Sequence, residues 1–264
     1  LKWELRLGWQ WMGFRGSATY FEERLRSGFR YSTVYAPYAY TQYDPSGIDG
    51  PALSAPPQLS ALPSTETTIL DGYRVATNGT RIDKQGVEFQ LTTPRWQTLR
   101  TSLTLTGAWF HSIYSNSQQL YSAVSDVYNG VSVADRYVGL YNYTDGRVND
   151  QINTNFMFDT QIPRWGLIFT TTLQCMWRVR TTRLPIDGIP TAYLDASDGQ
   201  LHPWTPDATS DPMLRYLIKT YNPESFNMVE IPFAGYLNLK ATKTIGRYLR
   251  IAMFVNRLLD WLPS

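Results

Sequence analysis

The chain is poor in charge, cysteine and long apolar runs. Asp, Glu, Lys and Arg make up 17% of its 264 residues, whereas soluble domains carry about 25%. Its one cysteine, Cys175, excludes an internal disulfide framework and a zinc site built from cysteines. No run of about 18 apolar residues is present, so no membrane-spanning helix is expected. The 24 basic and 22 acidic residues are evenly spread, which predicts no nucleic-acid partner.

The start of the chain lacks two further features. It has neither an initiator methionine nor a positively charged segment followed by an apolar stretch, and patterned sequence begins at Leu1. We therefore expect the chain to be a processed product or a part of a larger protein.

Aromatic residues are plentiful, and apolar side chains recur at every second position. The chain has 18 Tyr, 11 Phe and 9 Trp, and the two-residue repeat is typical of strands with one apolar face. Clear or partial repeats occur in segments 1–11, 14–25, 87–92, 102–106, 149–160, 165–180, 237–242 and 249–256. In the segment 165–180 the predicted apolar face runs from Leu167 through Cys175 and Trp177 to Val179. The pattern predicts about eight strands of roughly ten residues or more, a length that suits a bilayer-crossing strand better than a globular one.

The connections between these segments alternate between short and long. Short links are expected at 12–13, 93–96, 161–164 and 244–246, and long polar stretches at 31–80, 112–147 and 181–230. Outer-membrane barrels show this asymmetry, with short periplasmic turns and long extracellular loops. The sequence therefore predicts an all-β fold, a transmembrane antiparallel β-barrel in the bacterial outer membrane.

Solvation supports this interpretation. In hydrocarbon only a closed barrel satisfies all backbone groups, and the predicted outward faces carry no charge in their central parts. Tryptophans near strand ends would lie at the membrane interfaces: Trp3, Trp11, Trp96, Trp165 and Trp177. The alternative is that these side chains fill the core of a soluble protein.

The last part of the chain resembles a known family. The stretches 236–243 and 245–248, and above all Phe254-Val255-Asn256-Arg257-Leu258-Leu259-Asp260, resemble the C-terminal end of TonB-dependent outer-membrane receptors. The similarity is greatest to the SusC-like branch of Bacteroidetes, in which an Asn-x-Leu-Phe-Asp-like signature ends the penultimate strand. Leu259 stands where that signature has Phe. The segment 85–89 and the strand after it also resemble a hairpin of the family.

The resemblance implies a role in nutrient uptake. Residues 1–264 would be the C-terminal portion of a 22-stranded barrel, with the plug domain outside this chain and a final strand after Ser264. The protein would be an active importer of a glycan or peptide, without a cofactor and without enzyme activity. Its partners would be outer-membrane lipid, a SusD-like surface lipoprotein, and TonB through the plug. Two alternatives stay open: a self-contained eight-stranded barrel with an adhesin or structural role, and a soluble carbohydrate-binding module.

Catalytic and metal-binding signals are weak. His111 is adjacent to Ser112, but adjacency in sequence does not bring a base and a nucleophile together. Acidic residues occur in glycine-containing loops at Asp44, Asp49, Asp195 and Asp198, without the alternating ligands of a calcium loop. We expect ordinary turns there, no metal site and no catalytic site.

Tyrosine clusters in the long stretches are the better candidates for binding. The first cluster is Tyr31, Tyr35, Tyr38, Tyr40 and Tyr43, and the second is Tyr121, Tyr128, Tyr137, Tyr141 and Tyr143. Tyrosine combines an apolar ring with a hydroxyl, which suits sugars, peptides and protein contacts, although these rings can also pack the loops together. We take Tyr38, Tyr40 and Trp204 as candidate substrate contacts.

Overall fold

The structure, a computed structural model, describes residues 1–47, 59–142 and 145–262. It is an all-β protein built mainly from antiparallel strands, as predicted. The long strands are β1 (Lys2–Trp11), β2 (Phe14–Tyr43), β3 (Ser64–Thr92), β4 (Thr101–Asn116), β9 (Gly146–Ile162), β10 (Leu167–Arg183), β14 (Ala234–Ile245) and β15 (Leu249–Trp261).

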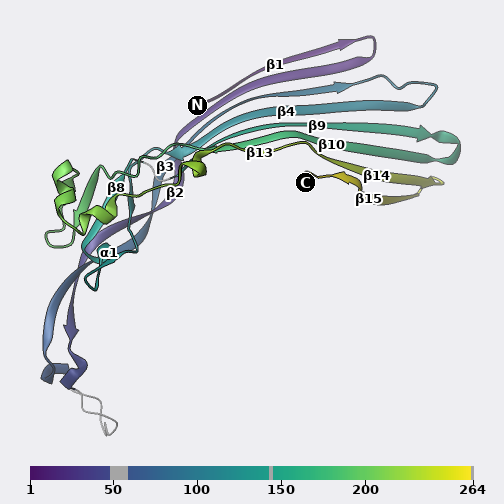
Figure 1. Ribbon diagram of the computed structural model, residues 1–264. Helices are drawn as coiled ribbons and strands as arrows, with labels where there is room; N and C mark the ends of the chain where they lie inside the picture. The colour runs from purple at the N-terminus through teal and green to yellow at the C-terminus, as the bar shows by residue number, and fades with distance from the viewer. Residues whose placement is uncertain (48–58, 143–144, 263–264) are drawn as a thin grey trace, which may run out of the picture.

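These strands form one sheet in the order β1-β2-β3-β4-β9-β10-β14-β15, with the short β13 (Val229–Ile231) beside β10. Every neighbour on this path is the next long strand along the chain, which confirms the prediction of about eight long antiparallel strands. Within the described residues β1 pairs only with β2 and β15 only with β14, so the sheet is open. Figure 1 shows it as a single curved layer with β1 and β15 at its two edges.

The short connections lie together at one end of the sheet (Figure 1). Met12 and Gly13 join β1 to β2 with φ angles of 47° and 83°, and positive φ at both positions is the requirement of a type I′ hairpin turn. The other short links span 93–100, 163–166 and 246–248. The alternation predicted from sequence is confirmed, although the link after β3 is longer than the predicted 93–96.

The first long stretch is not mainly a loop. β2 continues to Tyr43 and β3 begins at Ser64, and the two remain paired throughout this part. We call residues 30–43 and 64–77 the ribbon. The stretch is rich in Tyr, Thr and Val, which favour strands, and one ribbon face packs against the rest of the chain. These residues therefore extend the hairpin beyond the main sheet, whereas the sequence pattern predicts a loop there.

The other two long stretches fold together into a small distal layer beside the ribbon (Figure 1). A four-stranded sheet in the order β12-β11-β8-β5 forms its centre. The elements of the whole distal layer are β5 (Leu120–Ser122), β6 (Val127–Tyr128), β7 (Val131–Ser132), α1 (Val133–Arg136), β8 (Tyr137–Tyr141), β11 (Ala192–Asp195) and β12 (Leu201–Pro203). Short 3₁₀ turns are η1 (Pro45–Gly47), η2 (Leu59–Ala61), η3 (Pro163–Trp165), η4 (Pro206–Ser210), η5 (Leu214–Leu217) and η6 (Pro223–Phe226). None of the helical segments in the described part has the length and hydrophobicity of a bilayer-spanning helix.

The hydrophobic cores belong to this distal layer. One cluster joins Leu70 of the ribbon to Val138 and Leu194, and the second is built on Val133 and Leu217, both fully buried. Neither cluster includes a strand of the main sheet below the ribbon. The long strands therefore form a sheet that no other described layer covers.

The two faces of the main sheet differ in chemistry. The pocket face carries Lys2, Glu4 and Glu88, and the apolar face carries Leu5, Leu7 and other large apolar side chains. Across the pairing register, one apolar-face row reads Gly16, Leu91, Leu105, Phe156, Leu173, Leu237 and Leu259. This separation of faces holds from β1 to β15.

Two bulges change the predicted pattern. The register of β10 against β9 shifts between Met176 and Arg178, so Val179 lines the pocket face and does not extend the apolar face as predicted. In β15, residues 256–258 form a bulge opposite Asn238, whose side-chain oxygen accepts the N–H of Arg257 at 2.9 Å. Arg257 adopts a φ of 53° there. Alternation alone does not reveal the β10 bulge, because one inserted residue reverses the parity of every later position in the strand. The β15 bulge inserts two residues, so Val255 and Leu259 remain on the same face.

Candidate functional site

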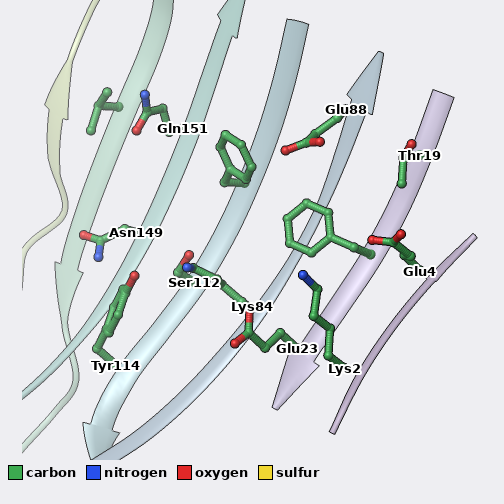
Figure 2. Close-up of a pocket in the computed structure, with 13 residues that line it drawn as sticks. Lys2, Glu4, Thr19, Glu23, Lys84, Glu88, Ser112, Tyr114, Asn149 and Gln151 are labelled. Atoms are coloured by element: carbon green, nitrogen blue, oxygen red, sulfur yellow. The ribbon is translucent and has the colours of Figure 1, made fainter. Parts of the chain in front are cut away.

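A hollow of about 620 Å³ lies on the pocket face of the sheet, and Figure 2 shows its side chains projecting from several adjacent strands. It is lined by Lys2, Glu4, Thr19, Phe21, Glu23, Lys84, Glu88, Phe110, Ser112, Tyr114, Asn149, Gln151 and Val179. Because alternate residues of each strand face the same side, the sheet brings these positions together from β1, β2, β3, β4, β9 and β10.

Opposite charges face one another across neighbouring strands in this hollow. The pairing register sets Lys2 opposite Glu23, and Glu23 opposite Lys84. None of the five charged lining residues forms an ion pair within 4.0 Å inside the described part of the chain. The hollow therefore offers both donors and acceptors to a polar molecule.

An aromatic pair crosses the next row of the hollow. Phe21 and Phe110 lie on either side of Gly86, and their ring centroids are 6.0 Å apart. A Cβ atom on Gly86 would lie 2.9 Å from the Phe21 ring and 2.5 Å from the Trp109 carbonyl oxygen. Glycine is therefore needed for the two rings to approach across β3.

Ser112 and His111, which are adjacent in the sequence, lie on opposite faces of the sheet. Ser112 lines the hollow, whereas His111 lies on the apolar face, where its Nδ1 is 2.9 Å from Oδ1 of Asp150. Adjacent residues of a strand point to opposite faces, so His111 and Ser112 cannot act on one substrate. The arrangement is suited to binding through hydrogen bonds and ring contacts.

The three residues predicted as substrate contacts do not form one site. Tyr38 and Tyr40 stack on each other on the ribbon with centroids 6.3 Å apart, and Tyr38 is exposed. They lie on the ribbon face opposite Tyr35, which packs against the distal layer. Trp204 packs in the second core cluster and meets Tyr193 edge to face. Tyr143 of the second tyrosine cluster lies outside the described residues.

The acidic loop residues form turns, as expected. The side chain of Asp195 accepts a hydrogen bond from the N–H of Ser197, and the side chain of Asp198 accepts one from the N–H of Gln200. These two bonds shape the β11–β12 hairpin. The Gln200 hydrogen bond, foremost among its contacts, lowers the pKa of Asp198. Nε2 of His202 lies 2.9 Å from Asp198 Oδ2, and Asp195, Asp198 and His202 could approach a single cation. Asp49 lies outside the described residues.

A half-buried amine lies inside the distal layer. The Nζ atom of Lys219 donates to the hydroxyl of Ser122 and lies 4.6 Å from the ring centroid of Tyr141. Burial lowers the pKa of Lys219 and raises that of Tyr141, whose hydroxyl donates to the Leu217 carbonyl oxygen at 2.6 Å. These contacts join β5 and β8 to η5 and to the residues just after it, so they stabilise the layer.

The pocket-face aromatic residues were not identified from sequence. Phe21 and Tyr114 belong to segments with irregular alternation, so no residue pattern marked them as neighbours. A glycine in the middle of a strand was the available signal, because such a glycine often marks close approach of another group.

In comparisons with protein-family models, curated protein sequences and solved structures, nothing matches this chain.

Proposed function

We propose that this sheet is a section of the wall of an outer-membrane β-barrel, and that the protein is a TonB-dependent importer of a glycan or peptide. The observation that carries the proposal is the uncovered apolar face. Leu5, Leu7 and Met253 are 69%, 67% and 67% exposed, and monomeric soluble proteins rarely expose a continuous apolar surface of this extent. Lipid would supply the apolar solvent that such a face requires.

The spacing of tryptophans on the apolar face fits a bilayer. Trp3 and Trp11 stand eight residues apart on β1, which corresponds to about 27 Å along a strand and about 20 Å across a layer at a tilt of about 40°. The apolar band of an outer-membrane barrel is about 25 Å high and is flanked by aromatic girdles. With this orientation the short turns are periplasmic, and the ribbon and distal layer are extracellular.

The importing role rests on the family resemblance and on the pocket face. In the proposed barrel the hollow with Phe21 and Phe110 would face the lumen, where mixed charges and rings suit a hydroxyl-bearing or amide-bearing solute. The resemblance adds a plug domain that contacts TonB, a SusD-like lipoprotein over the extracellular side, and a 22-stranded barrel.

A nitroxide scan tests the membrane placement. Single cysteines are introduced at residues 103–110 of β4 in a Cys175→Ser background, and the labelled protein is reconstituted in liposomes. Labels at Leu103, Leu105 and Trp109 are expected to be accessible to oxygen in the lipid, and labels at the alternate positions to a water-soluble nickel reagent. Uniform accessibility to the water-soluble reagent would exclude the proposal and favour a soluble module.

A cross-link distinguishes the large barrel from a self-contained one. In the same background, cysteines at Leu5 of β1 and Met253 of β15 would form a disulfide only if the two edge strands meet. We expect no intramolecular cross-link. An efficient cross-link in the folded protein would favour the eight-stranded barrel with an adhesin or structural role.

For the importer itself, native mass spectrometry of the protein with oligosaccharide and peptide mixtures gives a direct test. Phe110→Ala is expected to weaken the binding of the retained ligand, whereas Tyr248→Ala, at an exposed turn position, leaves it unchanged. Equal ligand binding by the original protein, Phe110→Ala and Tyr248→Ala would show that the hollow is not part of the transport path.

A further inference from the structure

A second hollow, of about 330 Å³, lies on the apolar face at the border of the apolar band. It is lined by Glu22, Arg24, Arg26, Arg81, Asp83, Lys84, Gln85, His111 and Ile113. The pairing register places Glu22, Gln85 and His111 in one row across β2, β3 and β4. The adjacent row toward the short turns is Tyr20, Val87 and Trp109. The change from rings and methyl groups to ionic side chains therefore takes place within one row.

The hollow has an excess of positive charge. Three arginines face two carboxylates, which leaves a net charge of +1, because the side chain of Lys84 projects into the first hollow on the other face of the sheet. Arg24 Nε donates to Glu22 at 2.5 Å, and Arg81 Nε donates to Asp83 at 2.8 Å. Each carboxylate thus fixes one guanidinium group while several of its five N–H donors stay unused.

Arg26 has no such partner. It is exposed in the bulge between Leu25 and Gly28, and it makes neither an ion pair nor a side-chain hydrogen bond with any residue that the structure describes. A cation at a bulge, beside two arginines held in place by carboxylates, is well placed to complete a three-arginine anion site. Arginine binds phosphate oxygens through paired N–H donors, with charge-assisted hydrogen bonds.

From this geometry we infer that Arg24, Arg26 and Arg81 bind the phosphate of an anionic lipid headgroup. The inference rests on the proposed function, since it requires the row of Tyr20, Val87 and Trp109 to contact acyl chains. The phosphate layer of a bilayer leaflet begins where the hydrocarbon ends, which is the level at which these arginines stand. A free phosphate ion would use the same donors but would gain nothing from the apolar row below.

The test measures lipid binding to the full chain purified in detergent. Phosphatidylglycerol is titrated, and bound lipid is counted by native mass spectrometry. Arg24→Gln, Arg26→Gln and Arg81→Gln combined are expected to weaken binding by at least about tenfold, because a single hydrogen bond to a charged group accounts for that much. Arg26→Gln alone, which breaks no described contact, should give a smaller loss in the same direction.

The matched control removes the same charge at the other end of the sheet. Arg95, Arg164 and Arg247 are exposed near the short turns and have no ion pair within the described ranges. Their combined replacement by Gln is expected to leave phosphatidylglycerol affinity within about twofold. Equal losses in both triple variants, or no loss in the first, would overturn the inference.

Two further arms identify the source of the phosphate and separate this inference from the proposed function. Inorganic phosphate in excess is expected not to displace phosphatidylglycerol; displacement would show that the site takes a free ion. The β4 nitroxide pattern is measured in the first triple variant. If the triple variant keeps the lipid-facing pattern and binds phosphatidylglycerol as tightly as the original protein, only the headgroup site is refuted. If the protein with all its arginines intact lacks the lipid-facing pattern, the membrane placement itself is refuted.

Discussion

Leu105 offers a sharp test of which solvent the apolar face meets. It pairs with Leu91 on one side and Phe156 on the other, in the middle of the apolar band. On β4 it stands four residues after Thr101 and six before His111. Each residue of a tilted strand rises about 2.6 Å along the membrane normal, so Leu105 lies about 10 Å in depth from Thr101 and about 16 Å from His111. Leu105→Arg therefore places a charge close to the bilayer midplane, where it is expected to cost about 2–4 kcal/mol.

The adjacent position is the control. Thr106 points to the pocket face, where it lines a smaller hollow next to the one with Phe21 and Phe110. Thr106→Arg should therefore change the free energy of unfolding by less than about 1 kcal/mol. The assay is urea titration of folding into phosphatidylcholine liposomes, followed by tryptophan fluorescence. Equal effects of the two arginines, or a loss below about 0.5 kcal/mol for Leu105→Arg, would show that the apolar face does not contact hydrocarbon.

Three other changes probe the hollow and the distal layer. Gly86→Ala is expected to destabilise the protein by about 1–3 kcal/mol through the clash with Phe21 and the Trp109 carbonyl, whereas Gly8→Ala, whose Cβ meets only a backbone oxygen at 3.9 Å, should have little effect in the same urea titration. Leu217→Ala removes a fully buried side chain from the second core cluster and should cost about 2–5 kcal/mol, measured as earlier proteolysis of the distal layer. Burial raises the pKa of Tyr141, so the folded protein keeps this proton above about pH 10, where the unfolded chain releases it. Stability should therefore fall as the pH rises past about 10, and this decline should be smaller in Tyr141→Phe; identical pH profiles would contradict the burial argument.

Much of the main sheet could be predicted from the sequence because each strand obeys one simple rule. Where one face is apolar and the other polar, the two-residue repeat identifies the strand and the side to which each residue points, as in 1–11 and 249–255. The rule fails where the environment changes along a strand. The ribbon packs one face on the distal layer and exposes tyrosines on the other, so its composition resembled that of a polar loop. Val179 shows the other limit, because the bulge before it depends on pairing with β9 and not on local composition.

The candidate site was less accessible to such reasoning. The sequence suggested that aromatic rings in the long stretches contact substrate, and the structure does stack Tyr38 on Tyr40. It places Trp204, however, within the packing of the distal layer. The meeting of Phe21 with Phe110 requires β2 and β4 to lie on either side of β3 in one register, which is a property of three strands together. Residue spacing within one segment carries no information about that contact.

The strand order has a consequence for how the chain reaches this state. Four hairpins, β1–β2, β3–β4, β9–β10 and β14–β15, close over short links and need only local encounters. The hairpins are joined by the pairings β2–β3, β4–β9 and β10–β14. The first encloses the tip of the ribbon, and the other two enclose the segments of the distal layer. Because these loops are longer, their closure costs more entropy, and we expect these pairings to form more slowly. Assembly would then proceed by pairing preformed hairpins edge to edge. The contacts of Leu70 in the ribbon with Val138, between β4 and β9, and with Leu194, between β10 and β14, would stabilise the joined hairpins.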